Sequence, residues 1–190
     1  MHLPTEVRRL KAVNASLQVS HPLWLSGYSD ASWKESTKEG GWGLWVRDHE
    51  TRILRAGPTP EWVTNITYAE FHGVEQALMT ALNHLCNRWA NIVVIKTDNQ
   101  SVASWFGWQN GNGVPKLHEA QERMKVVYET AALWNIRIIV KWVKGHQRND
   151  STACYLNNRV DSMAGKARKD RETFWWTCPI SNPPRFRAFS

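Results

Sequence analysis

Cysteine is scarce in this chain of 190 residues. Cys86, Cys154 and Cys178 are widely separated and form no C-x-x-C pair. This spacing argues against a disulfide scaffold and against a cysteine-rich zinc site. A reducing location inside the cell, the cytoplasm, is therefore expected.

Long apolar runs are also missing. The first twenty residues, MHLPTEVRRLKAVNASLQVS, lack the apolar stretch that a signal peptide needs. Elsewhere, no run approaches the roughly 20 apolar residues of a membrane span. We therefore expect no membrane partner.

Acidic residues are outnumbered by basic ones, 17 to 24, which gives a formal net charge of +7. This excess favours a polyanionic partner such as nucleic acid, although many basic proteins bind none. A hydrophobic content of 42% over 190 residues fits one globular domain with a core of its own. The chain shows no internal repeat, and we expect a monomer.

The order of the expected elements indicates an α/β protein. Three strands come first, at 23–32, 40–48 and 51–57, and two more follow at 91–98 and 136–143. Amphipathic or short helices are expected from about residue 67, where Thr67 and Glu70 have the spacing of a capping box, and at 100–106, 117–134 and 159–170. This order predicts a mixed five-stranded sheet, antiparallel over its first three strands and parallel over the last two, flanked by helices.

Four carboxylates lie at or near the ends of these elements: Asp30, Glu70, Asp98 and Asp161. In an α/β sheet, the carboxyl ends of parallel strands and the neighbouring helix N-termini border one crevice. The four groups are therefore expected to converge there, and their mutual repulsion calls for cations between them. Clustered carboxylate oxygens without cysteine ligands suit Mg²⁺ or Mn²⁺ better than zinc.

Each carboxylate also has a purely structural interpretation. Glu70 could be only the capping partner of Thr67, and Asp98 could cap the helix that follows it. Asp30 could be a turn residue, and Asp161 could be a solvated charge on a helix face. These alternatives remain open at the level of the residues alone.

The motifs around these residues resemble those of one family. They are GYSDAS around Asp30, TYAEFHGVEQAL around Glu70, VIKTDNQSV around Asp98, and WVKGHQ followed by NNRVDSMAGKA, which contain His146 and Asp161. In this order they resemble a type 1 ribonuclease H of the retroviral and bacterial superfamily, over about residues 23–169. The resemblance implies a ribonuclease H-like catalytic domain at 21–170, between a basic N-terminal extension at 1–20 and an aromatic, proline-containing tail at 171–190.

The resemblance further implies an endoribonuclease that cuts the RNA strand of RNA–DNA hybrids with two Mg²⁺ ions, for which Mn²⁺ can substitute. It assigns metal binding to the four carboxylates, with Asp30 as the bridging ligand. His146 would shuttle a proton or assist product release. Two alternatives stay open: a nuclease of this fold that acts on another nucleic acid, and a non-catalytic module that binds hybrids.

Substrate contacts are less well specified. By the resemblance, Gln100 would contact the minor groove, with Ser32 and Asn65 as further candidates. Lys166 and Lys169 are candidates for phosphate contacts, and Trp105 with Trp108 could stack on sugars or bases. The basic protrusion that well-known members carry is absent, because the segment FGWQNGNGVPK has Lys116 as its single base. Four other tryptophans, Trp42, Trp45, Trp134 and Trp142, are expected in the core.

Overall fold

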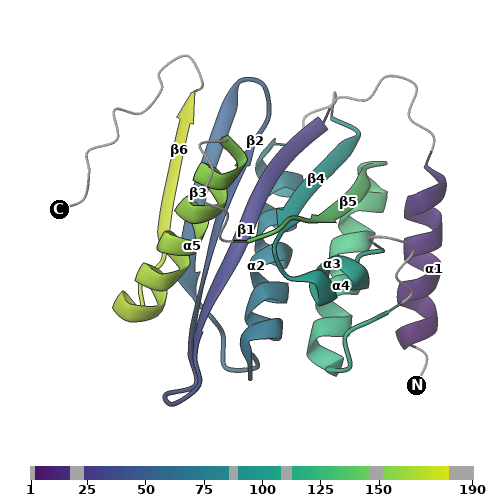
Figure 1. Ribbon diagram of the computed structural model, residues 1–190. Helices are drawn as coiled ribbons and strands as arrows, with labels where there is room; N and C mark the ends of the chain where they lie inside the picture. Colours follow the sequence, from purple (N-terminus) through teal and green to yellow (C-terminus); the bar gives the residue numbers. More distant parts are fainter. Residues whose placement is uncertain (1–2, 18–23, 86–89, 108–112, 146–151, 180–190) are drawn as a thin grey trace.

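A six-stranded mixed sheet forms the centre of the molecule (Figure 1). The structure, a computed structural model, describes residues 3–17, 24–85, 90–107, 113–145 and 152–179. Among them the strand order is β5-β4-β1-β2-β3-β6. The strands are β1 (Trp24–Lys34), β2 (Glu39–Arg47), β3 (Thr51–Pro58), β4 (Ile92–Thr97), β5 (Arg137–Trp142) and β6 (Phe174–Pro179).

The strand directions confirm the predicted mixed sheet. β1, β2 and β3 pair antiparallel, and β4 and β5 extend the sheet in parallel from the other side of β1. The predicted number of five strands was wrong, because β6 pairs antiparallel with β3. Part of the expected 171–190 tail therefore belongs to the sheet, through main-chain pairing that its proline-containing sequence did not indicate.

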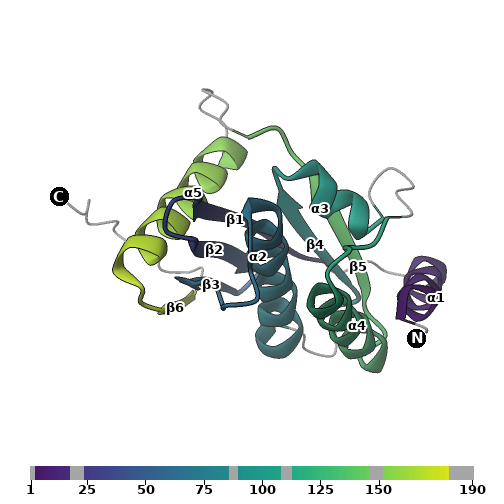
Figure 2. The same ribbon diagram turned by 90° about the horizontal axis from the view of Figure 1, so that it is seen from below.

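Helices cover the two faces of the sheet unequally (Figure 2). They are α1 (Leu3–Ser16), α2 (Ile66–Thr80), which continues into the π-helical turn η1 (Ala81–Leu85), α3 (Gln100–Trp105), α4 (His118–Leu133) and α5 (Thr152–Asp170). α2 and α4 lie on one face, with α1 beside α4, and α5 lies on the other. α5 begins seven residues before the predicted residue 159, within a segment expected to be a loop. None of the described helices has the length and apolar character of a membrane span.

The main core lies between the sheet and α2. Phe71, Val74 and Leu78 of α2 are fully buried, as their three- and four-residue spacing predicted. Trp42 and Trp45 are buried, which confirms their assignment to the core. The assignment was wrong for Trp134 and Trp142, which are 60% and 37% exposed. Trp134 follows the last turn of α4, and Trp142 is the last residue of β5.

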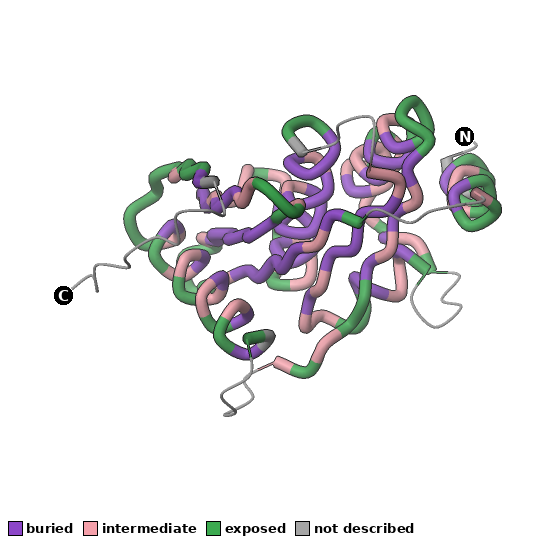
Figure 3. Tube along the Cα trace, turned by 90° about the horizontal axis from the view of Figure 1, so that it is seen from above, coloured by how far each residue is buried: buried purple, intermediate pink, exposed green. Residues whose placement is uncertain are grey.

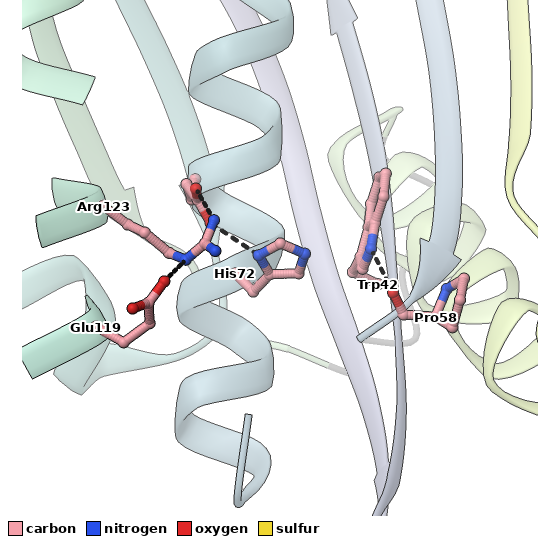
Figure 4. Close-up of polar contacts among 6 residues, drawn as sticks. Trp42, Pro58, His72, Glu119 and Arg123 are labelled. Atoms are coloured by element: carbon pink, nitrogen blue, oxygen red, sulfur yellow. Dashed lines mark hydrogen bonds and ion pairs between the residues drawn. The ribbon is translucent and has the colours of Figure 1, made fainter. Parts of the chain in front are cut away.

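A polar network, buried at His72 and Glu75, joins α2 to α4 (Figure 4). Nδ1 of His72 lies 2.7 Å from Oε2 of Glu75, and the other Glu75 oxygen accepts a hydrogen bond from Arg123 at 3.2 Å. Arg123 also pairs with Glu119, at 2.9 Å. A buried carboxylate such as Glu75 is strongly destabilising without partners, so these contacts fix how the two helices meet. His72 is thereby a structural histidine.

Helix α1, from the expected N-terminal extension, packs against α4 and β5. Val7 is fully buried, and Asn14 is 7% exposed. The Asn14 side chain donates to the carbonyl of Ile136 at 2.9 Å and accepts from the N–H of Ile138 at 3.0 Å. A single amide thus satisfies two main-chain groups of the β5 segment.

Asn14→Ala should lower the free energy of unfolding by about 2 kcal/mol, because it leaves two main-chain groups without their partner. Urea unfolding of both proteins would measure the loss. Asn158→Ala, at an exposed position of α5, is the matched control and should change stability little. Equal losses in the two variants would contradict this role of Asn14.

Candidate active site

The parallel pairing of β1 with β4 places Asp30 and Asp98 at the same height along the sheet. The ladder between these strands ends at Tyr28 and Lys96. Asp30 lies two residues further along β1, and Asp98 lies two residues beyond Lys96. Because side chains alternate along a strand, Asp30 projects from the same face of the sheet as Tyr28. Both aspartates thus lie at the same edge, where the two strands stop pairing.

Glu70 comes from the first half of α2. The N-cap of this helix is Asn65, whose side chain accepts from the N–H of Tyr68 at 3.1 Å. The predicted capping box of Thr67 and Glu70 was therefore wrong, because the N-cap lies two residues earlier, at Asn65, whose side chain satisfies the first turn. Glu70 is 5% exposed and points inward. It has no capping task.

Asp98 does not cap α3 either, because its neighbour Asn99 is the N-cap. The side chain of Asn99 caps α3 by accepting from the N–H of Val102 at 3.1 Å. The main-chain carbonyl of Asp98 accepts a hydrogen bond from Nε1 of Trp142 at 2.9 Å. A tryptophan from the neighbouring strand thus holds the backbone that carries Asp98.

Asp161 reaches the same region because α5 packs very close to the sheet. Gly43 pairs with Asp30 in the β1–β2 register. A Cβ at Gly41 or Gly43 would overlap the backbone of α5, at Ala164 and Val160 respectively. The two glycines therefore let the helix approach the strand beside Asp30, and they bring Asp161 within electrostatic reach of it.

The carboxylates of Asp30, Glu70 and Asp98 form one cluster. Each offers one oxygen, and these three oxygens lie within 4.8 Å of one another. Oε2 of Glu70 is buried without a hydrogen-bond partner among the described residues. An unsatisfied carboxylate oxygen beside two further carboxylates fits a divalent cation that prefers oxygen ligands, such as Mg²⁺ or Mn²⁺.

The electrostatics of the cluster agree with this assignment. Burial raises the pKa of Asp30 to about 7, and the charges of Asp98 and Asp161 act in the same direction. Burial also raises the pKa of Glu70 well above its ordinary value, and repulsion from Asp30 and Asp98 adds to this shift. At neutral pH the ionised cluster is therefore unfavourable unless positive charge is placed within it.

Comparison with known proteins identifies the family. The model of the RNase H family matches residues 25–169. The chain belongs to the RNase H family. No curated protein matches the chain in sequence.

Several solved structures share the RNase H fold. The N-terminal RNase H domain of rv2228c from Mycobacterium tuberculosis, solved as a fusion with maltose-binding protein, matches with a TM-score of 0.54 and 18% identity, over 78% of this chain and 96% of that one. LC11-RNase H1 in complex with an RNA/DNA hybrid matches with a TM-score of 0.56 and 14% identity, over 77% and 97%. RNase H1 from the archaeon Halobacterium salinarum matches with a TM-score of 0.52 and 16% identity, over 77% and 98%.

The residues expected to contact nucleic acid are dispersed in this RNase H fold. Gln100 is exposed at the first position of α3, and Lys169 is exposed near the end of α5. Asn65 serves as the N-cap of α2, and the hydroxyl of Ser32 accepts a hydrogen bond from Arg168 at 3.0 Å. These two side chains therefore have structural partners, and their roles toward nucleic acid stay predictions.

Two of the other candidates contact aromatic rings. Trp105 stacks on Tyr68, with ring centroids 5.9 Å apart, and packs against the main core. Nζ of Lys166 lies 5.5 Å from the centre of the Phe174 ring. His146 and Trp108 lie outside the described residues, so the roles predicted for them also stay predictions.

The sequence analysis missed two residues beside Asp98. Trp142 was assigned to the core, and its indole N–H instead holds the Asp98 carbonyl. Gly145 lies so close to Asp98 that a Cβ there would overlap the carboxylate oxygen Oδ2. A glycine two residues after the predicted strand at 136–143 was a detectable signal of a close approach.

The raised pKa values predict a pH-dependent stability in the absence of divalent cations. The pKa of Asp30 is higher in the folded than in the unfolded chain, so its contribution to stability is complete below about pH 4. It is lost as the pH rises through about 7. Urea unfolding in chelator from pH 5 to 8 should show the decline, and Asp30→Asn should make it shallower. Parallel curves for the two proteins would contradict the shift.

Gly145→Ala should displace the Asp98 carboxylate and weaken Mn²⁺ binding by roughly 10- to 100-fold, the usual effect of disturbing a metal ligand's surroundings. Isothermal titration calorimetry would measure it. Gly165→Ala is the matched control, because a Cβ at that helical position meets nothing within 4 Å. Unchanged Mn²⁺ affinity in Gly145→Ala would show that the close approach has no bearing on the metal.

Proposed function

We propose that the protein is a metal-dependent endoribonuclease that hydrolyses the RNA strand of RNA–DNA hybrids. The observation that carries this proposal is the convergence of Asp30, Glu70 and Asp98, with Asp161 in electrostatic reach, in a chain of the RNase H family. Carboxylates far apart in sequence and crowded together in a partly buried site are otherwise difficult to explain. Because fold alone does not specify an activity, the proposal depends on the site.

The four carboxylates would hold two Mg²⁺ ions, with Mn²⁺ as a substitute. Two bound cations would activate the attacking water and stabilise the departing oxygen in an in-line displacement at phosphorus. Asp30 is central among the carboxylates, because the charges of both Asp98 and Asp161 act on it, and it is therefore the best candidate for a shared ligand. Glu70 supplies an oxygen that lacks any other described partner.

The remaining residues would orient the nucleic acid. Gln100 is exposed two residues after Asp98, so it is near enough to contact the sugar edge beside the cut bond. The side chains of Arg168 and Ser32, joined by a hydrogen bond, lie on α5 and β1, the elements that carry Asp161 and Asp30. His146 follows Gly145 directly and is proposed to move a proton or assist product release.

A nuclease with a different substrate is the second candidate. The segment between α3 and α4 contains one base, Lys116, so it offers little attraction for a DNA strand. This observation favours testing all-RNA and all-DNA duplexes, single strands and DNA junctions beside the hybrid. An intracellular location and a monomeric state belong to the same proposal.

Asp98→Asn should lower the rate of hybrid cleavage by roughly two to three powers of ten, because it removes one charge that stabilises the reacting site. Gel analysis of labelled hybrids with Mg²⁺, with Mn²⁺ and with chelator would measure this. Asp170→Asn, at the exposed last position of α5, is the matched control and should cleave normally.

The same cleavage panel discriminates among the candidate functions. Faster cleavage of an all-RNA or all-DNA substrate would replace the hybrid with that substrate. Undiminished activity in chelator would exclude the metal-dependent mechanism. Hybrid binding without cleavage at any metal concentration would indicate a non-catalytic module.

A further inference from the structure

One part of the sheet lacks a helical cover on the side that carries α5. α5 packs on β1, β2 and β3. Among the described residues, no helix packs over β4 and β5 on this face: α2 and α4, with α1 beside α4, lie on the other side (Figure 2), and α3 lies at the lower ends of β4 and β5 (Figure 1). The tube in Figure 3 shows the same arrangement from above. This part of the sheet without a helix comprises β4, β5 and the adjoining side of β1, and it is called the open face below.

The open face carries positive charge and no negative charge along its strands. Residues 24–28, 92–96 and 137–141 contain three basic residues and no Asp or Glu. Lys96 and Lys141 are register partners, and Arg137 lies two pleats from Lys141 on the same side of β5. Arg47, exposed at the end of β2, projects from the same face of the sheet. A surface of this kind attracts a polyanion.

The cations begin directly beside the carboxylate cluster. Lys96 precedes Asp98 by two residues. Two residues are one side-chain repeat of a β-strand, about 7 Å. Nζ of Lys96 donates to the hydroxyl of Tyr28 at 2.9 Å and lies 4.7 Å from the centre of its ring. The positive charge of Lys96 is therefore held in place before any ligand binds.

The floor of the open face suits bases and sugars as well as phosphates. Val94 and Ile139 lie between the cations and form register partners on β4 and β5. Trp24, at the end of the open face that is farthest from the carboxylates, is 69% exposed. Exposed aromatic side chains in a basic surface are the usual platform for unpaired bases.

The open face is wide enough for one nucleic-acid strand and too narrow for a duplex. Three neighbouring strands span about 10 Å, roughly the diameter of one α-helix. α5 borders this strip on the β2 side, and a double helix is considerably wider than the strip. One nucleic-acid strand fits beside α5.

We propose that a single-stranded extension of the substrate leaves the carboxylate cluster and lies along the open face, with its phosphates near Lys96, Lys141, Arg137 and Arg47 and a base on Trp24. The inference rests on the proposed function for the position of the substrate at the carboxylates. It also supplies a source of affinity in a chain whose α3–α4 segment has one base.

The test measures binding in chelator, so that no cleavage occurs. The probes are a blunt RNA–DNA hybrid, the same hybrid with a single-stranded RNA extension of about ten nucleotides at the 3′ or the 5′ end, and the same hybrid with a duplex extension of equal length. The double variant Arg137→Glu with Lys141→Glu reverses two charges of the open face. The matched control, Arg8→Glu with Arg9→Glu on α1, changes the net charge equally at exposed positions.

For the wild type, one of the two extensions should tighten binding by roughly tenfold, in the range of one stacked base. The open-face variant should lose this gain, and the slope of its log affinity against log salt should become shallower by about 1.4, the value for two single-strand phosphates. The control should keep the gain. Lys141→Ala, a milder change at an exposed position, should lose part of it.

Three results would overturn the inference: no gain from either extension in the wild type, equal losses in both double variants, or an equal gain from a duplex extension. Cleavage of the blunt hybrid with Mg²⁺ is measured separately. Its absence would refute the proposed function, whereas the binding of the extension decides the role of the open face.

Discussion

Repulsion among buried carboxylates is the constraint on which the rest of this structure depends. Asp30 and Glu70 are 4% and 5% exposed, and their oxygens lie within 4.8 Å of each other and of an Asp98 oxygen. In water such groups would separate and ionise, whereas here the fold holds them together and raises the pKa values of Asp30 and Glu70. The energy that opposes their ionisation is the source of their affinity for divalent cations.

Close backbone packing holds the cluster together against that repulsion. α5 approaches β2 over Gly41 and Gly43, and the segment after β5 approaches Asp98 at Gly145. Asn65 and Asn99 cap the helices beside the site, which leaves Glu70 and Asp98 without capping tasks. The helix caps are thus distinct from the cluster, whose backbone contact is the hydrogen bond that the Ala31 N–H donates to Oδ1 of Asp30 at 2.7 Å.

The sequence predicted those features that follow from the spacing of apolar residues and from the order of helices and strands. The amphipathic helices and the order of strands predicted the layers, and the carboxylates near the ends of the elements predicted where three of them meet. The sequence did not predict features that depend on which residues become neighbours in the folded chain. The N-cap of α2 is Asn65, two residues before the predicted Thr67. Trp142 is 37% exposed because it ends β5, where its indole N–H donates to the Asp98 carbonyl.

Both borders of the sheet are protected from pairing with another protein chain. β6 pairs with β3 at one border, and the Asn14 amide of α1 binds the β5 segment at the other. An outer strand with unpaired main-chain groups is a template for another chain. β6 occupies that position on β3, and α1 shields the β5 segment at the opposite border. A version trimmed to residues 24–170 would retain every candidate metal ligand and lose both shields. Such a protein would be prone to self-association and aggregation, even with its catalytic groups intact.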